Sequence, residues 1–170
     1  MNVNESAGKE LLDQMDDTQK GKYLTFSLGE EIYGIEIKFV TEIVVVGMQS
    51  VTTVPDLPEY VQGIINLRGK IIPVIDVRLR FKKPPCDYND RTCIVIVDIR
   101  GIAVGLIVDT VQEVLSIADQ DMVPPPQLNS NTYHQRFIKA IGKVNNAVKL
   151  ILDCDRLLSD DEIVSLEQTG

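Results

Sequence analysis

Residues 63–78 read Gly63-Ile-Ile-Asn-Leu-Arg-Gly-Lys-Ile-Ile-Pro-Val-Ile-Asp-Val-Arg78, with an apolar run following a short polar stretch. Asn66-Leu67-Arg68-Gly69-Lys70 has the composition of a tight bend, in which Gly69 is free to take a positive φ angle. The run that follows has the length of a buried strand. This stretch therefore predicts two extended segments joined by a bend.

Similar apolar segments, separated by Gly, Pro or Asn, continue on both sides of this stretch from Tyr23 onwards. This pattern is typical of many short antiparallel strands, and it predicts a mainly β protein. The predicted strands are Tyr23–Leu28, Ile32–Ile37, Thr41–Met48, Lys70–Val77, Thr92–Ile99, Ile102–Val108, Glu113–Ile117, Ile138–Val144 and Ala147–Leu152.

Two short helices complete the predicted elements. The first runs from Asp56 to Gly63, because Pro suits a first helical turn and Gly suits a left-handed end. The second covers residues 159–170, where Ser159 and Glu162 have the spacing of a capping box and Leu158 and Ile163 that of a hydrophobic staple. We expect this second helix to pack on a barrel through Ile163 and Leu166.

An internal repeat is visible in the strands. Tyr33-Gly34-Ile35 aligns with Val104-Gly105-Leu106, and further along the chain Ile71–Val77 aligns with Val148–Cys154. Two copies of a five-stranded unit favour two small closed barrels of the SH3 or OB type. Taken as contiguous stretches, the predicted parts are a flexible tail (1–21), a first barrel (22–85), a second barrel (90–158) and the C-terminal helix (159–170).

The composition argues against several classes of partner. The 170 residues carry a net charge of −8, 5% aromatic residues and no Trp, which disfavours nucleic acid. Three scattered cysteines, Cys86, Cys93 and Cys154, fit a reducing cytoplasm. The segment 1–21 is acidic and does not resemble a secretory signal. No apolar run reaches the ~20 residues of a membrane-spanning helix, so we expect no direct membrane insertion.

The side chains of catalytic and metal sites are scarce. The one histidine, His134, lies in a polar segment typical of an exposed loop, which disfavours a zinc site. Asp76 and Asp153 could be read as a catalytic pair, but they occupy equivalent repeat positions and are better explained as strand-end residues that accept backbone hydrogen bonds. We therefore predict a binding protein with no catalytic residue, metal site or cofactor.

Residues 63–78 closely resemble the signature of the CheW family of chemotaxis coupling proteins. Tyr33–Ile37, Val40–Ile43 and Val104–Asp109 resemble other recurrent stretches of that family, in the same order, so that the resemblance covers about residues 22–168. It implies a duplicated pair of five-stranded barrels, related to the regulatory domain of the chemotaxis histidine kinase. The resemblance also allows strands to be exchanged between the two units, which would change the contiguous boundaries given above.

The resemblance implies a non-catalytic adaptor that couples the cytoplasmic tips of chemoreceptors to the histidine kinase, in arrays at the inner face of the membrane. The helical receptor tip would bind in the groove between barrels, where glycine permits close approach and charged residues fix the register. On surface statistics alone, the arginine of this set would be a solvated turn residue. The matching positions are Val40, Glu42, Gly63, Arg68 and Gly105.

In the family, the kinase binds at the outer ends of the barrels. This chain has a valine at position 123 where a basic residue is frequent in the family, so this contact is expected to differ. The matching positions are Val44, Val46, Cys93, Val123 and Leu128.

Two alternatives stay open. Small five-stranded barrels also bind nucleic acids or oligosaccharides, although the net charge of −8 and the lack of clustered basic and aromatic residues count against this interpretation. The other alternative is the coupling domain of a longer, receiver-containing relative. The end of the chain shows no βα alternation typical of a receiver, so a stand-alone coupling protein is preferred.

Overall fold

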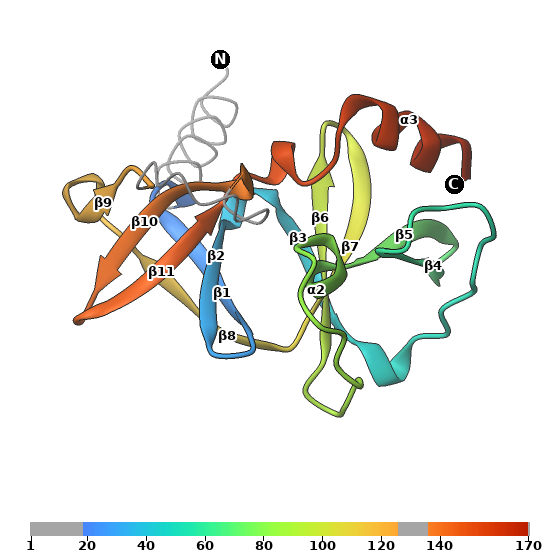
Figure 1. Cartoon of the computed structure of the whole chain (residues 1–170), viewed down its shortest axis with the longest axis horizontal. Helices are drawn as coiled ribbons and strands as arrows, with labels where there is room; N and C mark the ends of the chain where they lie inside the picture. The colour runs from blue at the N-terminus through green and yellow to red at the C-terminus, as the bar shows by residue number, and fades with distance from the viewer. Residues whose placement is uncertain (1–18, 126–135, 170) are drawn as a thin grey trace, which may run out of the picture.

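In a computed structural model that describes residues 19–125 and 136–169, the chain forms two β-sheets, here termed sheet A and sheet B. Sheet A contains, in spatial order, β8 (Thr110–Ser116), β1 (Lys22–Leu28), β2 (Glu31–Glu36), β11 (Ala147–Leu152), β10 (Ile138–Val144) and β9 (Met122–Val123). Sheet B contains β3 (Val40–Val45), β6 (Cys93–Ile99), β7 (Ile102–Val108), β5 (Lys70–Asp76) and β4 (Val61–Leu67). Figure 1 shows sheet A on the left and sheet B on the right.

The strand orders of the two sheets correspond, as the internal repeat predicts. In the first five positions, β8-β1-β2-β11-β10 matches β3-β6-β7-β5-β4. Each sheet also contains one parallel pair at the same place, with Gly34 opposite Ile151 in sheet A and Gly105 opposite Val74 in sheet B. The fold class predicted from the sequence, mainly β with two similar five-stranded units, is therefore confirmed.

The sheets do not coincide with the contiguous stretches 22–85 and 90–158. Sheet B is one continuous stretch, Val40–Val108, inserted between β2 and β8 of sheet A. In terms of the repeat, β3 to β5 of the first copy pair with β6 and β7 of the second. Because such an exchange replaces each strand by its equivalent, both sheets keep the same order and the local pattern of residues does not reveal it.

The helix predicted from Asp56 to Gly63 is wrong. Residues 55–60 form turns, and Gly63 lies inside β4. Tertiary pairing explains the difference, because Ile64 donates its N–H to the Thr52 carbonyl (2.9 Å) and Asp76 donates to the Tyr60 carbonyl (2.8 Å). The short helix of the fold is instead α2 (Val77–Arg80), which follows β5. The nine predicted strands are present, with ends within three residues of those expected.

A large core is shared by both sheets. It includes Phe26 and Tyr33 from sheet A and Val95 and Leu106 from sheet B, all within 1% of complete burial. A smaller core lies on the other face of sheet B and is formed by Ile65, Ile72, Val74, Ile94, Ile96 and Ile107. The central strands of sheet B are thus buried on both faces, which explains why their sequences are apolar throughout.

The C-terminal helix α3 (Asp160–Thr169) lies over sheet B (Figure 1). Its capping box is confirmed, because Glu162 N donates to Ser159 Oγ (3.2 Å) and Ser159 N donates to Glu162 Oε1 (2.8 Å). Ile163 and Leu166 are buried in the large core, as predicted. The predicted tail falls outside the described residues over positions 1–18.

Candidate docking surfaces

The bend of the signature segment is a two-residue turn between β4 and β5. Arg68 and Gly69 have φ angles of 52° and 84°, and Asn66 Oδ1 accepts a hydrogen bond from Gly69 N (2.8 Å). Positive φ at both central residues defines the type I′ turn that suits a tight hairpin. The sequence predicts the positive φ of Gly69 but not that of Arg68. The Asn145-Asn146 turn of the second copy has the same form, with φ angles of 52° and 64°.

Arg68 forms an ion pair with Glu42, which reaches it from β3. The Arg68 side chain is 72% exposed and that of Glu42 is 28% exposed. The pair lies in an open groove of sheet B that also includes apolar side chains, among them Leu67 and Ile72. Of the five predicted receptor-binding residues, these two are therefore brought together, with charged and apolar atoms side by side. The groove is lined by sheet B alone, whereas the resemblance places the receptor between the two barrels.

Gly63 and Gly105 pack against their own chain. A Cβ atom on Gly63 would lie 2.7 Å from the carbonyl carbon of Thr52, and closer still to its oxygen. A Cβ atom on Gly105 would lie 2.7 Å from Cγ2 of Ile94. Both glycines are buried, and the space that they leave is filled by sheet B itself. Their glycine identity is explained by folding alone.

The remaining predicted positions that the structure describes are all half-buried. Val40 is half-buried against the large core, and Val44 and Val46 are half-buried against the smaller one. Cys93 is half-buried at the start of β6, opposite Val45, and Val123 is half-buried in β9. Leu128 lies outside the described residues.

The exposed apolar side chains on β3 and after it belong to residues that the sequence did not single out. Ile43 is 42%, Val45 is 39% and Met48 is 81% exposed, and we call these three residues the β3 patch. Alternate residues of a strand point to opposite faces, so Val44 faces inward where its neighbours face outward. Thr41–Met48 is too uniformly apolar for its sequence to show which residues face outward.

Exposed apolar residues recur at equivalent places of the two copies. Ile43 on β3 corresponds to Val114 on β8, which is 50% exposed, and Ile71 on β5 (38%) corresponds to Val148 on β11 (55%). The alignment of the two repeat copies shows from the sequence that these positions are equivalent, but not that they are exposed. Each sheet therefore exposes apolar side chains at two equivalent positions.

The residues expected to have structural roles behave accordingly. Asp76 Oδ1 accepts a hydrogen bond from Leu79 N (3.3 Å), and Asp153 Oδ1 accepts one from Asp155 N (3.0 Å). Each aspartate thus caps the turn after its strand, as predicted. His134 lies outside the described residues.

Residues 19–125 and 136–169 contain neither a cluster of metal ligands nor a helix suited to span a membrane. No group of three or more His, Cys, Asp or Glu side chains in these ranges could hold a metal ion. None of the helices in the same ranges is long and apolar enough to cross a membrane.

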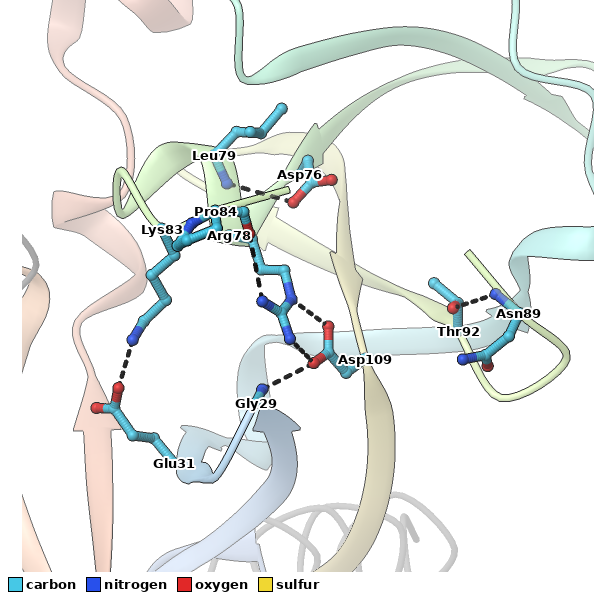
Figure 2. Close-up of polar contacts among 10 residues, drawn as sticks. All are labelled: Gly29, Glu31, Asp76, Arg78, Leu79, Lys83, Pro84, Asn89, Thr92 and Asp109. Atoms are coloured by element: carbon cyan, nitrogen blue, oxygen red, sulfur yellow. Dashed lines mark hydrogen bonds and ion pairs between the residues drawn. The ribbon is translucent and has the colours of Figure 1, made fainter. Parts of the chain in front are cut away.

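Polar contacts join the two sheets where β1 turns into β2 (Figure 2). Asp109, which links β7 of sheet B to β8 of sheet A, accepts hydrogen bonds from Gly29 N (2.7 Å) and Arg78 Nε (2.7 Å). Arg78 Nη2 donates to Asp109 Oδ2, the oxygen that also accepts from Gly29 N, whereas Arg78 Nε donates to Oδ1. Lys83 pairs with Glu31 beside them. α2 and the segment after it are thereby tied to the first hairpin of sheet A.

Two small barrels that share a core and expose apolar side chains on equivalent strands define a binding module of the scaffold class. The family model of the CheW-like domain matches residues 22–162 of this chain. The chain therefore belongs to the CheW family. Within that family it is a non-catalytic scaffolding protein of chemotaxis that couples receptors to a kinase.

Individual relatives cover most of the chain. The chemotaxis protein CheW of Klebsiella aerogenes is 31% identical over 154 residues, which are 91% of each chain. The CheW protein of Treponema pallidum is 34% identical and covers 84% of this chain and 85% of its own. The crystal structure of the scaffolding protein TtCheW from Thermoanaerobacter tengcongensis is similar with a TM-score of 0.75 and 39% identity, over 84% of this chain and 94% of that one.

Proposed function

We propose that this chain binds the helical cytoplasmic tip of a chemoreceptor on one surface and the regulatory domain of the chemotaxis histidine kinase on another. The protein would act in the cytoplasm and reach the inner face of the membrane through the receptors. The two surfaces differ in chemistry. One combines an ion pair with a groove of mixed polar and apolar side chains, and the other consists of exposed apolar side chains on the outer strands.

The observation that carries the receptor surface is the Glu42–Arg68 pair at the groove of sheet B. An amphipathic helix can place its apolar face against the half-buried Leu67 and Ala103 while its polar residues meet the two charges. The turn holds Arg68 at a fixed place, so its guanidinium can set the position of the helix along the groove. Val40, Gly63 and Gly105 would support this surface from within.

The kinase surface is proposed on the outer strands of the barrels. The β3 patch supplies exposed apolar area, which on a folded protein is typical of an interaction site. The inward-facing Val44 and Val46 and the neighbouring Cys93 would hold this strand in shape. Val123, and Leu128 beyond the described residues, are proposed for the second kinase contact.

A pair of single substitutions tests the separation of the two surfaces. Arg68→Ala should weaken binding of a receptor cytoplasmic fragment about 30-fold, since a hot-spot side chain contributes about 2 kcal/mol, and should leave kinase binding nearly unchanged. Val45→Asp, which places a charge in the β3 patch, should have the converse effect. Calorimetric titration with each partner measures both affinities.

Arg156→Ala serves as the control for Arg68→Ala, because Arg156 is also an exposed arginine in an ion pair but lies after β11, in a segment that holds no residue proposed for either surface. It should change neither affinity by more than a small factor. The proposal fails if Arg68→Ala lowers the two affinities together while the circular dichroism spectrum stays that of the parent.

A further inference from the structure

The two sheets are joined by a shared apolar core and by directional polar contacts. Apolar burial is non-directional, so the core favours contact between the sheets without strictly fixing the angle at which they meet. A guanidinium that donates two parallel hydrogen bonds to one carboxylate has a defined geometry. Contacts of this second kind are therefore the ones able to select a single angle.

Arg78 and Asp109 make such a contact. Arg78 lies on α2, directly after β5 of sheet B. It donates from Nε and Nη2 to the two oxygens of Asp109, and its Nη1 donates to the Pro84 carbonyl (3.3 Å). The same carboxylate accepts Gly29 N from the first hairpin of sheet A (2.7 Å). Figure 2 shows these groups converging on one carboxylate, with the Lys83–Glu31 pair beside them.

The surroundings favour a firm contact. The side chains of Arg78 and Asp109 are 17% and 25% exposed, so water competes less with them than with the surface pairs of the chain. Asp109 also donates its own N–H to the Ser27 carbonyl (3.2 Å), which fixes its backbone against β1. The carboxylate is thus held from both sheets, which is the arrangement required of a brace between them.

An equivalent contact occurs in the second copy of the repeat. In the alignment of the copies, Gly29 in the β1–β2 turn corresponds to Arg100 in the β6–β7 turn, and Arg78 corresponds to Asp155. Arg100 Nη2 donates to the Asp155 carbonyl (2.6 Å), and Arg100 also pairs with Asp160. In both copies, the tip of a hairpin in one sheet is bound to the turn that follows the parallel-paired strand of the other sheet. The charges are arranged differently, yet the same two elements are joined.

We propose that Arg78 and Asp109 are positioning residues that set the angle between sheet A and sheet B, with Arg100 bracing the opposite side. Substituting them leaves both barrels folded but widens the range of angles between them. One consequence rests on the proposed function. In the unsubstituted protein, this pair would hold the receptor surface of sheet B at a fixed orientation relative to the exposed apolar side chains of sheet A.

The test measures distances within the isolated full-length protein. In a background with Cys86→Ser and Cys93→Ser, spin labels are attached at Met48→Cys on the sheet B side and Lys143→Cys on sheet A. Double electron–electron resonance then gives the distribution of distances between the labels. Arg78→Ala should widen this distribution and shift its mean, and Arg78→Lys should also widen it, because an ammonium keeps the charge but loses the two parallel hydrogen bonds.

Arg156→Ala is the matched control, because Arg156 pairs with Asp153 within one segment (3.4 Å) and does not join the sheets. Its distribution should coincide with that of the parent. If the Arg78→Ala and Arg78→Lys distributions also coincide with that of the parent, the core alone sets the angle and the inference is overturned. Should Arg78→Ala not fold, Arg78→Lys and Asp109→Asn give the same test. No partner is present, so failure here is distinct from failure of the proposed function.

Discussion

Gly63 shows how a residue inside a signature segment can owe its identity to folding. Its φ angle of 148° lies in a region that other residues rarely adopt, and the Thr52 backbone occupies the place of a Cβ atom. Because these neighbouring atoms belong to the backbone rather than to a flexible side chain, they cannot easily move aside. This explanation differs from the sequence argument, which attributes the glycine to the approach of a receptor helix.

Gly63→Ala should therefore lower the free energy of unfolding by about 1–3 kcal/mol, through overpacking against Thr52 and strain in φ. Gly69→Ala is the matched control, since Gly69 also has a positive φ (84°) but no heavy atom lies within 4 Å of the place that a Cβ atom would take. It should show the smaller cost of strain alone. Urea unfolding measures both, and equal losses in the two variants would contradict the role of Thr52.

Single positions were predictable where the local sequence determines the backbone or a cap. The bend at Gly69 and the capping roles of Asp76 and Asp153 follow from residue type and spacing, and the structure confirms them. The outward face of β3 did not follow, because Val44 and its neighbours are all apolar and no alternation is visible. Its orientation is set by pairing with β6, which lies far along the chain, beyond β4 and β5.

Among the secondary structure elements, α3 is the one whose sequence specifies it most fully. Its capping box closes the first turn, and Glu162 also accepts a hydrogen bond from Arg80 Nη2 (3.1 Å). Arg80 is 5% exposed and donates from Nε to the Leu157 carbonyl (2.7 Å). Glu162 therefore serves both the start of the helix and a buried cation.

Ser159→Ala should lower the free energy of unfolding by about 1 kcal/mol, the usual cost of losing an N-cap side chain. Glu162→Ala should cost more, because it also removes a carboxylate partner of the buried Arg80. Val164→Ala, at a site 50% exposed, provides the control and should stay within about 0.5 kcal/mol of the parent. Urea titrations in which Ser159→Ala costs more than Glu162→Ala would contradict this ranking.

The element that the sequence misassigned lies between Asp56 and Gly63. Pro58 and the flanking polar residues are typical of a helix start, but the partners that decide the outcome are distant in sequence. Thr52 pairs with Ile64, and Tyr60 accepts from Asp76, so the chain is drawn into sheet B. Local propensity gives way here to hydrogen bonding with strands from elsewhere in the chain.

At the level of the whole molecule, Asp109 connects the two sheets, and its environment predicts that its contribution to stability depends on pH. Burial alone would raise the pKa of this carboxyl, but hydrogen bonds from Arg78 and Gly29, together with the charge of Arg78, hold the pKa below its usual value of 3.8. The carboxylate is thus favoured in the folded protein. Its contribution to stability is complete above the unfolded pKa and is lost as pH falls through the lowered, folded pKa.

Asp109→Asn should be less stable than the parent at neutral pH, and the difference in unfolding free energy should shrink as pH falls below about 3.8. The reason is that protonation removes from the parent the same charge that the substitution removes. Urea unfolding of both proteins at a series of pH values measures the gap. A gap that stays constant into the acid range would show that the charge of Asp109 does not contribute.

The global arrangement was predictable only in part. Apolar periodicity and the repeat were sufficient to predict two similar β units, because both are visible within short stretches such as Ile71–Val77. The assignment of strands to sheets could not be predicted, since exchanging equivalent strands leaves every local pattern of residues unchanged. The family resemblance allowed for that exchange, but the residues themselves carry no sign of it.

The insertion of sheet B within sheet A has a consequence for synthesis on the ribosome. The β1–β2 hairpin emerges first, yet its neighbours β8 and β11 belong to residues 110–152. All the strands of sheet B are available once Val108 has left the exit tunnel. At that point β1 and β2, which carry Phe26 and Tyr33, still lack their neighbours β8 and β11. A nascent chain halted before Thr110 has emerged would thus carry all the strands of sheet B and a β1–β2 hairpin without either of its neighbours, the form in which chaperones would meet it.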